Sequence, residues 1–130
     1  MTIKNKQGID NTHQRIEIES DISANLIFSG LNIDVSEEVN CDAFKIADDS
    51  NADIEITLKD GTKNSLSSGY ECAGLQKNGN YGTLVIQVDN ESNGYLTATG
   101  GDYGAGIGGG RGGSASNISI SGGTITATGG

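Results

Sequence analysis

Residues 53–58 read Asp-Ile-Glu-Ile-Thr-Leu, and residues 83–88 read Thr-Leu-Val-Ile-Gln-Val. In both stretches an aliphatic side chain recurs at every second position. Residues 117–121, Asn-Ile-Ser-Ile-Ser, repeat the same pattern. Successive side chains of a strand point to opposite faces, so a period of two predicts strands with one buried face.

These runs belong to a longer repeat of about 30 residues. Each run follows a short apolar segment that begins at an alanine, and Ala43, Ala73 and Ala105 are 30 and 32 residues apart. A third run closes each unit, in residues 64–69, 95–101 and 124–130. A fixed period of this length is typical of solenoids, in which each repeat buries its apolar face against its neighbours.

Three short strands per unit, separated by turns rich in Gly, Asn, Asp and Ser, predict a three-sided coil. We therefore expect an all-β fold, a right-handed parallel β-helix of about four coils with three short strands per coil. Equivalent residues of neighbouring coils should stack at about 4.8 Å. The expected inward ladders are Ile54, Leu84 and Ile118, and next to them Ile56, Ile86 and Ile120.

The whole chain, residues 1–130, is predicted to be a single solenoid domain. The predicted parts are an opening coil and cap in residues 1–40 and repeat units in residues 41–70, 71–102 and 103–130. The last unit is regular and ends on Gly129 and Gly130, with no capping segment after it. We therefore expect either a fragment of a longer protein or end-to-end self-association of the coils.

Composition excludes several classes of partner. The formal net charge is −9, and phosphate binding needs clustered Lys and Arg, so neither nucleic acid nor an anionic membrane surface is an expected partner. No apolar run approaches the roughly 20 residues of a membrane span, so membrane insertion is not expected. The N-terminal residues show no secretory signal, which fits either a cytosolic protein or a piece of a longer secreted one.

Two blocks near the C-terminus resemble a known glycine-rich repeat. Residues 104–110 read Gly-Ala-Gly-Ile-Gly-Gly-Gly, and residues 122–130 read Gly-Gly-Thr-Ile-Thr-Ala-Thr-Gly-Gly. Residues 40–130 thereby resemble repeats of large cell-surface proteins of Firmicutes, notably clostridia and gut commensals. The resemblance implies a pectate-lyase-like β-helix in a secreted or cell wall-attached protein.

The candidate ligand-binding residues are Tyr70, Tyr95, Asp102 and Tyr103. Tyr70 and Tyr103 precede equivalent alanines, so both rings should emerge near one edge of the stack. Sugar rings pack on such amphipathic faces, while neighbouring polar side chains bind hydroxyls. We therefore expect a non-catalytic binding or adhesion module whose partner is a polysaccharide or a host or cell-surface glycoprotein. The other interpretation is that these rings only cover coil corners.

Residues 89–94 resemble the front of a calcium loop. Asp89, Glu91 and Asn93 supply oxygen ligands at alternate positions, and Gly94 is sixth, as in an EF-hand. The twelfth position is Gly100, where such a loop needs a bidentate glutamate. An ordinary turn is therefore the favoured interpretation, with Ca²⁺ as the one candidate cofactor.

Cys41 and Cys72 are separated by about one repeat and, aligned on the alanines, differ by one position in register. They form either one disulfide between adjacent coils or two small buried side chains.

An enzyme is not expected. A β-helix that cleaves polysaccharides needs stacked carboxylates on one outer face, and the equivalent outward positions are Glu55, Val85 and Ser119. The candidate bases His13, Arg15 and Arg111 fall in different coils. The alternatives to a binding module are a structural spacer or fibre-forming solenoid and, after it, a polysaccharide lyase or hydrolase.

Overall fold

The computed structural model describes residues 1–5, 12–89 and 93–130, and these form thirteen strands in three parallel sheets. Sheet A contains, in order, β1 (Thr2–Ile3), β3 (Ala24–Phe28), β6 (Asp53–Leu58), β9 (Thr83–Val88) and β12 (Ile118–Ile120). Sheet B contains β4 (Asn32–Asp34), β7 (Lys63–Ser67), β10 (Tyr95–Thr99) and β13 (Thr124–Thr128). Sheet C contains β2 (Ile16–Ile18), β5 (Phe44–Ile46), β8 (Leu75–Lys77) and β11 (Ile107–Gly108).

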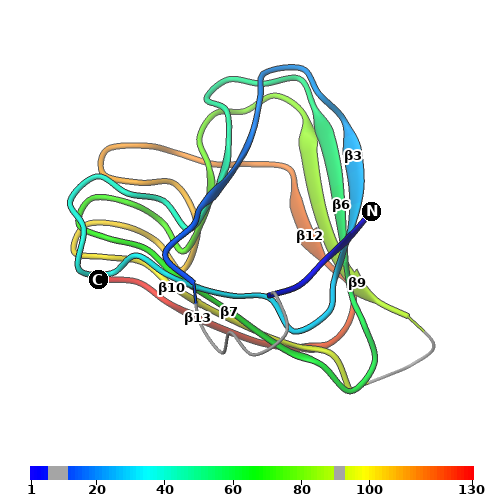
Figure 1. The fold of residues 1–130 in the computed structure, drawn as a ribbon. Coiled ribbons are helices and arrows are strands. Elements are labelled where there is room, and N and C mark those ends of the chain that lie inside the picture. Colours follow the sequence, from blue (N-terminus) through cyan, green and yellow to red (C-terminus); the bar gives the residue numbers. More distant parts are fainter. Residues whose placement is uncertain (6–11, 90–92) are drawn as a thin grey trace.

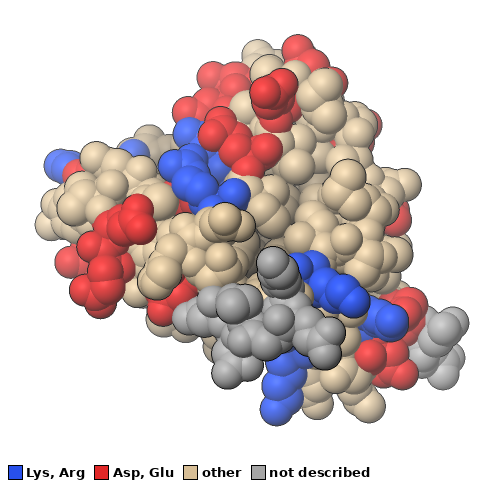
Figure 2. All heavy atoms as spheres, viewed as in Figure 1, with Lys and Arg blue, Asp and Glu red and all other residues tan. Residues whose placement is uncertain are grey.

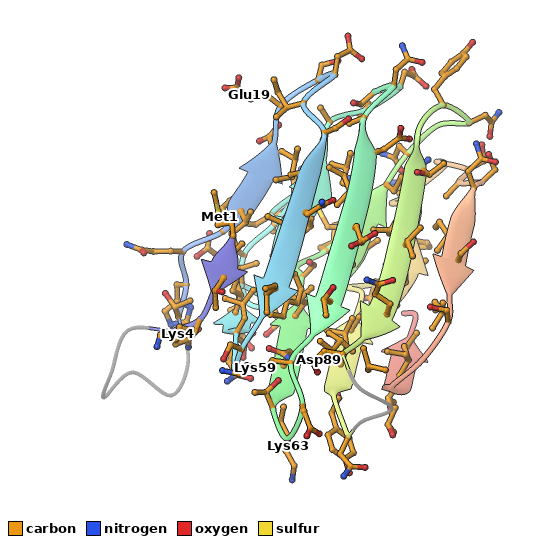
Figure 3. All side chains as sticks on the ribbon, turned by 90° about the vertical axis from the view of Figure 1, so that its right-hand side faces the viewer. Met1, Lys4, Glu19, Lys59, Lys63 and Asp89 are labelled. Carbon is orange, nitrogen blue, oxygen red and sulfur yellow. The ribbon has the colours of Figure 1, made fainter. Side chains whose placement is uncertain are left out.

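The chain visits the three sheets in turn and so winds into a solenoid. From β3 onward it passes from sheet A to sheet B to sheet C and back to sheet A, one coil beyond the previous strand. Figure 1 looks along the stack, with the coils superimposed, and Figure 3 shows the strands of sheet A side by side. The prediction of a parallel β-solenoid of about four turns, with three strands per coil, is confirmed.

The inward ladders of sheet A also form as predicted. Ile54 pairs with Leu84 and Leu84 with Ile118, while Ile56 pairs with Ile86 and Ile86 with Ile120. The members on β6 and β9 are all at most 1% exposed. Ile120 is 49% exposed, because β12 is the last strand of sheet A in the described residues. An inward side chain of these ladders is therefore fully buried when a coil packs on both sides of it.

The opening region contributes strands to all three sheets. Residues 1–40 contain β1, β2, β3 and β4, and these strands extend all three sheets. The alternation in residues 16–18 and 32–34 thus has the same cause as in the later units. The two-residue strand β1 was not predicted, since a pair of residues carries no measurable period.

Alanine spacing is the wrong guide to register in sheet C. Phe44 pairs with Leu75 and Leu75 with Ile107, which are separations of 31 and 32 residues. Aligning Ala43 with Ala73 gives 30 and is one residue out. The large buried side chains set the register, because Phe44 and Leu75 fill the interior completely.

Glycine is needed where stretches of backbone touch in the connections between sheets B and C. A Cβ atom on Gly104 would lie 2.0 Å from the carbonyl oxygen of Cys72, and one on Gly74 would lie 2.6 Å from the backbone nitrogen of Thr99. No side chain fits in either place, so the connections between sheets B and C depend on close backbone approach.

The described part of the chain contains no helix that is long and apolar enough to cross a membrane.

Candidate ligand-binding site

A polar cavity lies on the outer side of sheet C, beside β5, β8 and the loop that follows β11. Its volume is about 260 Å³. Its walls include Asp42, Lys45, Glu71, Cys72, Gln76 and Arg111. We call it the sheet C cavity. These side chains are gathered because Lys45 and Gln76 pair across β5 and β8, so the outward positions of two coils share one wall.

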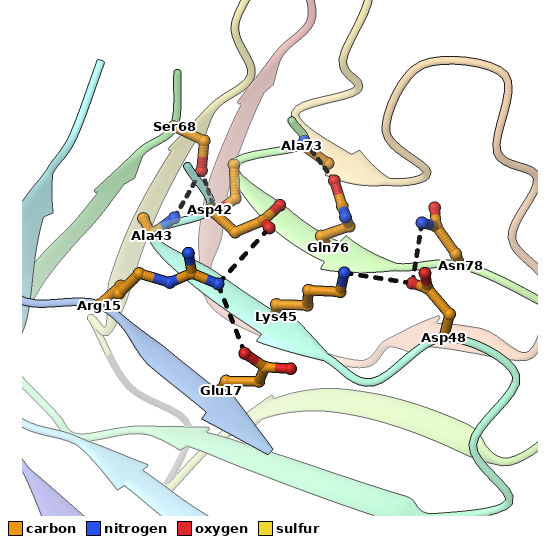
Figure 4. A network of polar contacts seen from close by, with 11 residues as sticks. Arg15, Glu17, Asp42, Ala43, Lys45, Asp48, Ser68, Ala73, Gln76 and Asn78 are labelled. Carbon is orange, nitrogen blue, oxygen red and sulfur yellow. Dashed lines mark hydrogen bonds and ion pairs between the residues drawn. The ribbon is translucent and has the colours of Figure 1, made fainter. Parts of the chain in front are cut away.

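Asp42 is the most deeply buried carboxylate of this cavity. Its side chain is 6% exposed, and one oxygen, Oδ2, lies 3.9 Å from the guanidinium of Arg15 (Figure 4). That guanidinium is closer to Glu17, at 3.4 Å. The second oxygen, Oδ1, has no hydrogen-bond partner of good geometry among the described residues. Burial raises the pKa of Asp42, although the nearby thiol of Cys72 acts in the opposite direction.

The cations on the cavity wall are already paired. Lys45 lies 3.5 Å from Asp48, whose Oδ1 also accepts a hydrogen bond from the side-chain amide of Asn78 at 3.0 Å (Figure 4). Arg111 forms an ion pair with Glu71 across the mouth of the cavity, and this hydrogen bond raises the pKa of Arg111. The wall therefore offers hydrogen-bonding groups rather than free cationic charge.

Two buried polar side chains hold the backbone around the cavity. The Oε1 atom of Gln76 accepts a hydrogen bond from the backbone N–H of Ala73 at 2.9 Å (Figure 4). The hydroxyl of Ser68 accepts one from the backbone N–H of Ala43 at 2.8 Å. Both bonds hold the backbone next to Asp42 and Cys72 in place.

An exposed aromatic pair borders the cavity. The rings of Tyr70 and Tyr103 meet edge to face, with centroids 5.7 Å apart, and their exposures are 39% and 63%. The guanidinium of Arg111, which lines the cavity, lies 5.3 Å from the centroid of the Tyr103 ring. The two tyrosines thus emerge at one edge, as the sequence predicts, and Arg111 joins them to the cavity. We call Tyr70 and Tyr103 the tyrosine pair.

The other two predicted ligand-binding residues differ in position. Asp102 is exposed next to Tyr103, and its backbone carbonyl accepts a hydrogen bond from the N–H of Glu71. Tyr95 begins β10, at the opposite end of sheet B from Tyr70, and its ring contacts Lys63, whose ammonium lies 5.9 Å from the centroid. The structure therefore groups Asp102 with the tyrosine pair and places Tyr95 elsewhere.

Of the predicted calcium ligands, Asp89 follows β9 of sheet A and Asn93 precedes β10 of sheet B. Oδ1 of Asp89 accepts a hydrogen bond from the backbone N–H of Asp60, and the N–H of Asn93 donates to the carboxylate of Asp60. Glu91 lies outside the described residues. Within the described ranges, no three His, Cys, Asp or Glu side chains are grouped to hold a metal ion. Through these bonds Asp89 and Asn93 contact the turn at Asp60 of the preceding coil.

Cys41 and Cys72 are buried free thiols in the structure. Pairing of Val39 with Tyr70 and of Phe44 with Leu75 places the two cysteines at equivalent positions, which corrects the one-residue offset expected from the alanines. Equivalent positions stack at about 4.8 Å with parallel side chains, whereas a disulfide brings two Cβ atoms to about 3.8 Å. Burial raises the pKa of both thiols, that of Cys72 to about 12.

The side chains considered for catalysis are separated. His13 Nδ1 lies 2.6 Å from the backbone carbonyl of Asp34, remote from the sheet C cavity. On the outer face of sheet A, Glu55 accepts a hydrogen bond from Gln87 at 3.1 Å. A larger hollow, of about 470 Å³, has Ile3, Leu31 and Ile33 in its wall.

Sequence reasoning missed Asp42, Lys45 and Gln76 as site residues. For Lys45 and Gln76 the available signal was their place after the alanine of each unit, where polar side chains of two units pair, whereas Asp42 precedes its alanine and carries no such signal. Charge gave no signal, because acidic and basic side chains are interspersed over the surface, as Figure 2 shows for one face.

The fold and site define the chain as a parallel β-solenoid with a polar cavity beside two exposed tyrosines. Comparison with family models, with curated proteins and with solved structures gave no match.

Proposed function

We propose that this solenoid is a non-catalytic binding or adhesion module that recognises a glycan. The observation that carries the proposal is the exposed tyrosine pair, which Arg111 joins to the sheet C cavity. The apolar face of a sugar ring packs well on an aromatic ring, while carboxylate, amide and guanidinium groups bind its hydroxyls. The partner would be a polysaccharide or the glycan of a host or cell-surface glycoprotein.

The resemblance of residues 104–110 and 122–130 to repeats of Firmicutes surface proteins supports this proposal. It favours a secreted or cell wall-attached protein of the pectate-lyase-like β-helix type. An extracellular location would bring the tyrosine pair into contact with polysaccharide and glycoprotein.

A glycan array tests the proposal. We expect the wild-type chain to bind a subset of glycans, and the double variant Tyr70→Ala/Tyr103→Ala to lose at least about tenfold in affinity, since aromatic side chains dominate such contacts. Tyr81→Ala is the matched control, because Tyr81 is 59% exposed and lies outside the cavity wall. Unchanged binding by the double variant would remove the tyrosine pair from the site.

A structural spacer is the second candidate, favoured by the regularity of the stack. All five residues of β10 pair in register with β7 on one side and with β13 on the other. Such stacking suits a stalk whose stability adds coil by coil. This function predicts that no glycan on the array is bound.

A further inference from the structure

The sheet C cavity holds more negative than positive charge. The charged side chains on its wall are Asp42, Asp48, Glu71, Lys45 and Arg111. Lys45 contacts Asp48, and Arg111 contacts Glu71. Asp42 is therefore the one carboxylate on this wall that forms no ion pair with a cation of the wall, although Lys45 still attracts it at longer range.

The charge of Asp42 is also poorly compensated from behind. The contact of Oδ2 with Arg15 is long, at 3.9 Å, and Arg15 is shared with Glu17 at the shorter distance of 3.4 Å. Oδ1 is enclosed and accepts no hydrogen bond of good geometry within the described residues. A buried charge is screened by solvent much less than a surface charge, so its negative potential extends into the cavity.

We infer that the sheet C cavity selects neutral, hydroxyl-rich sugars against uronic acids, and that Asp42 is the residue that sets this specificity. A uronate carboxylate would approach Asp42 while finding Lys45 and Arg111 already paired. Hydroxyl groups meet no such repulsion, because they donate hydrogen bonds to carboxylates and accept them from cations. Asp42 acts here through its charge and not by touching the ligand. This inference rests on the proposed function, whose substrate class it names.

Matched pairs of oligosaccharides on the same array test it. Each pair ends in glucose or glucuronate, or in galactose or galacturonate, and differs only in the carboxylate. We expect the wild type to bind the neutral member at least about tenfold more tightly. Asp42→Asn keeps the shape of the side chain and should reduce that ratio about tenfold, mainly by improving binding of the acidic member.

The control variant is Glu19→Gln, which changes the net charge by the same amount at an exposed position that does not line the cavity. We expect it to leave the ratio unchanged. Circular dichroism of each variant checks that the fold is retained.

Titration of the wild type supplies a readout that a purely structural role would not give. The groups that face Asp42 are Arg15, Lys45, Asp48 and Cys72. Because burial raises the pKa of Asp42, its protonation should weaken the rejection of glucuronate as the pH falls. Asp42→Asn should show no such change.

The outcomes separate the two proposals. If the Tyr70→Ala/Tyr103→Ala variant loses binding but the wild type binds uronates as tightly as neutral sugars, the function stands and the inference is overturned. An unchanged ratio in Asp42→Asn also overturns it. If no saccharide binds, both proposals fail together.

Discussion

Sheets A and C have the same backbone geometry but different interiors. The inward positions of β6 and β9 hold Ile54, Ile56, Leu84 and Ile86, all apolar and at most 1% exposed. In sheet C the equivalent row continues from Ile46 to Lys77, a lysine that is only 2% exposed. One face of the solenoid is thus a continuous hydrocarbon ladder, while another buries an ionisable group.

Polar burial is concentrated near sheet C. The buried polar side chains on β8 and in the segments that flank β5 and β8 are Asp42, Ser50, Ser68, Gln76 and Lys77. Most of them bond to backbone groups, which offsets the cost of removing them from water. We infer that the aliphatic ladders of sheet A stabilise the stack, so that sheet C can carry polar groups arranged for another purpose.

Ile86→Ala should have the largest effect on stability, because it removes the centre of a ladder. Ile86 is fully buried between Ile56 and Ile120. We expect the free energy of unfolding to fall by about 2–5 kcal/mol, as measured by urea denaturation. Val85→Ala on the outward face of the same strand should cost less than about 1 kcal/mol. Equal losses in the two variants would contradict the assignment of sheet A as the stabilising face.

Lys77→Met tests the contribution of the buried lysine of sheet C. The ammonium of Lys77 donates hydrogen bonds to three backbone carbonyls, those of Gly79 at 3.4 Å, Tyr81 at 2.9 Å and Ser116 at 3.0 Å. Methionine fills similar space but leaves these carbonyls without that donor. We expect a loss of about 1–3 kcal/mol in urea denaturation. A gain in stability would show that sheet C merely tolerates the lysine.

The same lysine should make stability depend on alkaline pH. Burial lowers the pKa of Lys77 from 10.5, so between that lowered pKa and 10.5 the unfolded chain binds more protons than the folded one. The free energy of unfolding should therefore rise with pH across this window, relative to Lys77→Met. Parallel urea titrations of both proteins from pH 8 to about pH 10.5 measure the difference. Identical slopes would contradict a buried Lys77.

The fold could be predicted from sequence because its signals are local and repeated. Alternation in residues 53–58, 83–88 and 117–121 fixes which side chains point inward, and turn residues mark the corners. The register of sheet C was harder to predict from the sequence. It depends on how Phe44 packs on Leu75, which spacing between small alanines does not report.

The candidate site could be predicted from the sequence only in part. Tyr70 and Tyr103 were predicted to emerge together because both precede equivalent strands, and their rings do meet. The cavity beside them arises from groups of three coils, including Arg111 of a glycine-rich loop that carries no period. Nothing local indicates that Asp42 is buried, since its neighbours Asp48 and Asp49 are exposed turn residues of similar appearance.

Asp42→Asn should have the smallest effect on stability and the opposite sign. A buried carboxylate with a long ion pair and an oxygen without a hydrogen bond costs free energy in the folded state, and asparagine removes the charge while keeping the shape. We expect the variant to be more stable than the wild type at pH 7, by up to about 1 kcal/mol.

The sign of its pH dependence follows from the raised pKa of Asp42. Between the unfolded value near 3.8 and the raised folded value, the folded chain binds more protons, so the wild type regains stability as the pH falls through that window. The advantage of Asp42→Asn should therefore shrink on acidification, as urea denaturation at pH 7 and pH 4 would measure. A variant less stable than the wild type at pH 7 would mean that Arg15 compensates Asp42 fully. Sheet C would then bury its polar groups without cost, and the contrast with sheet A would reduce to a difference in composition.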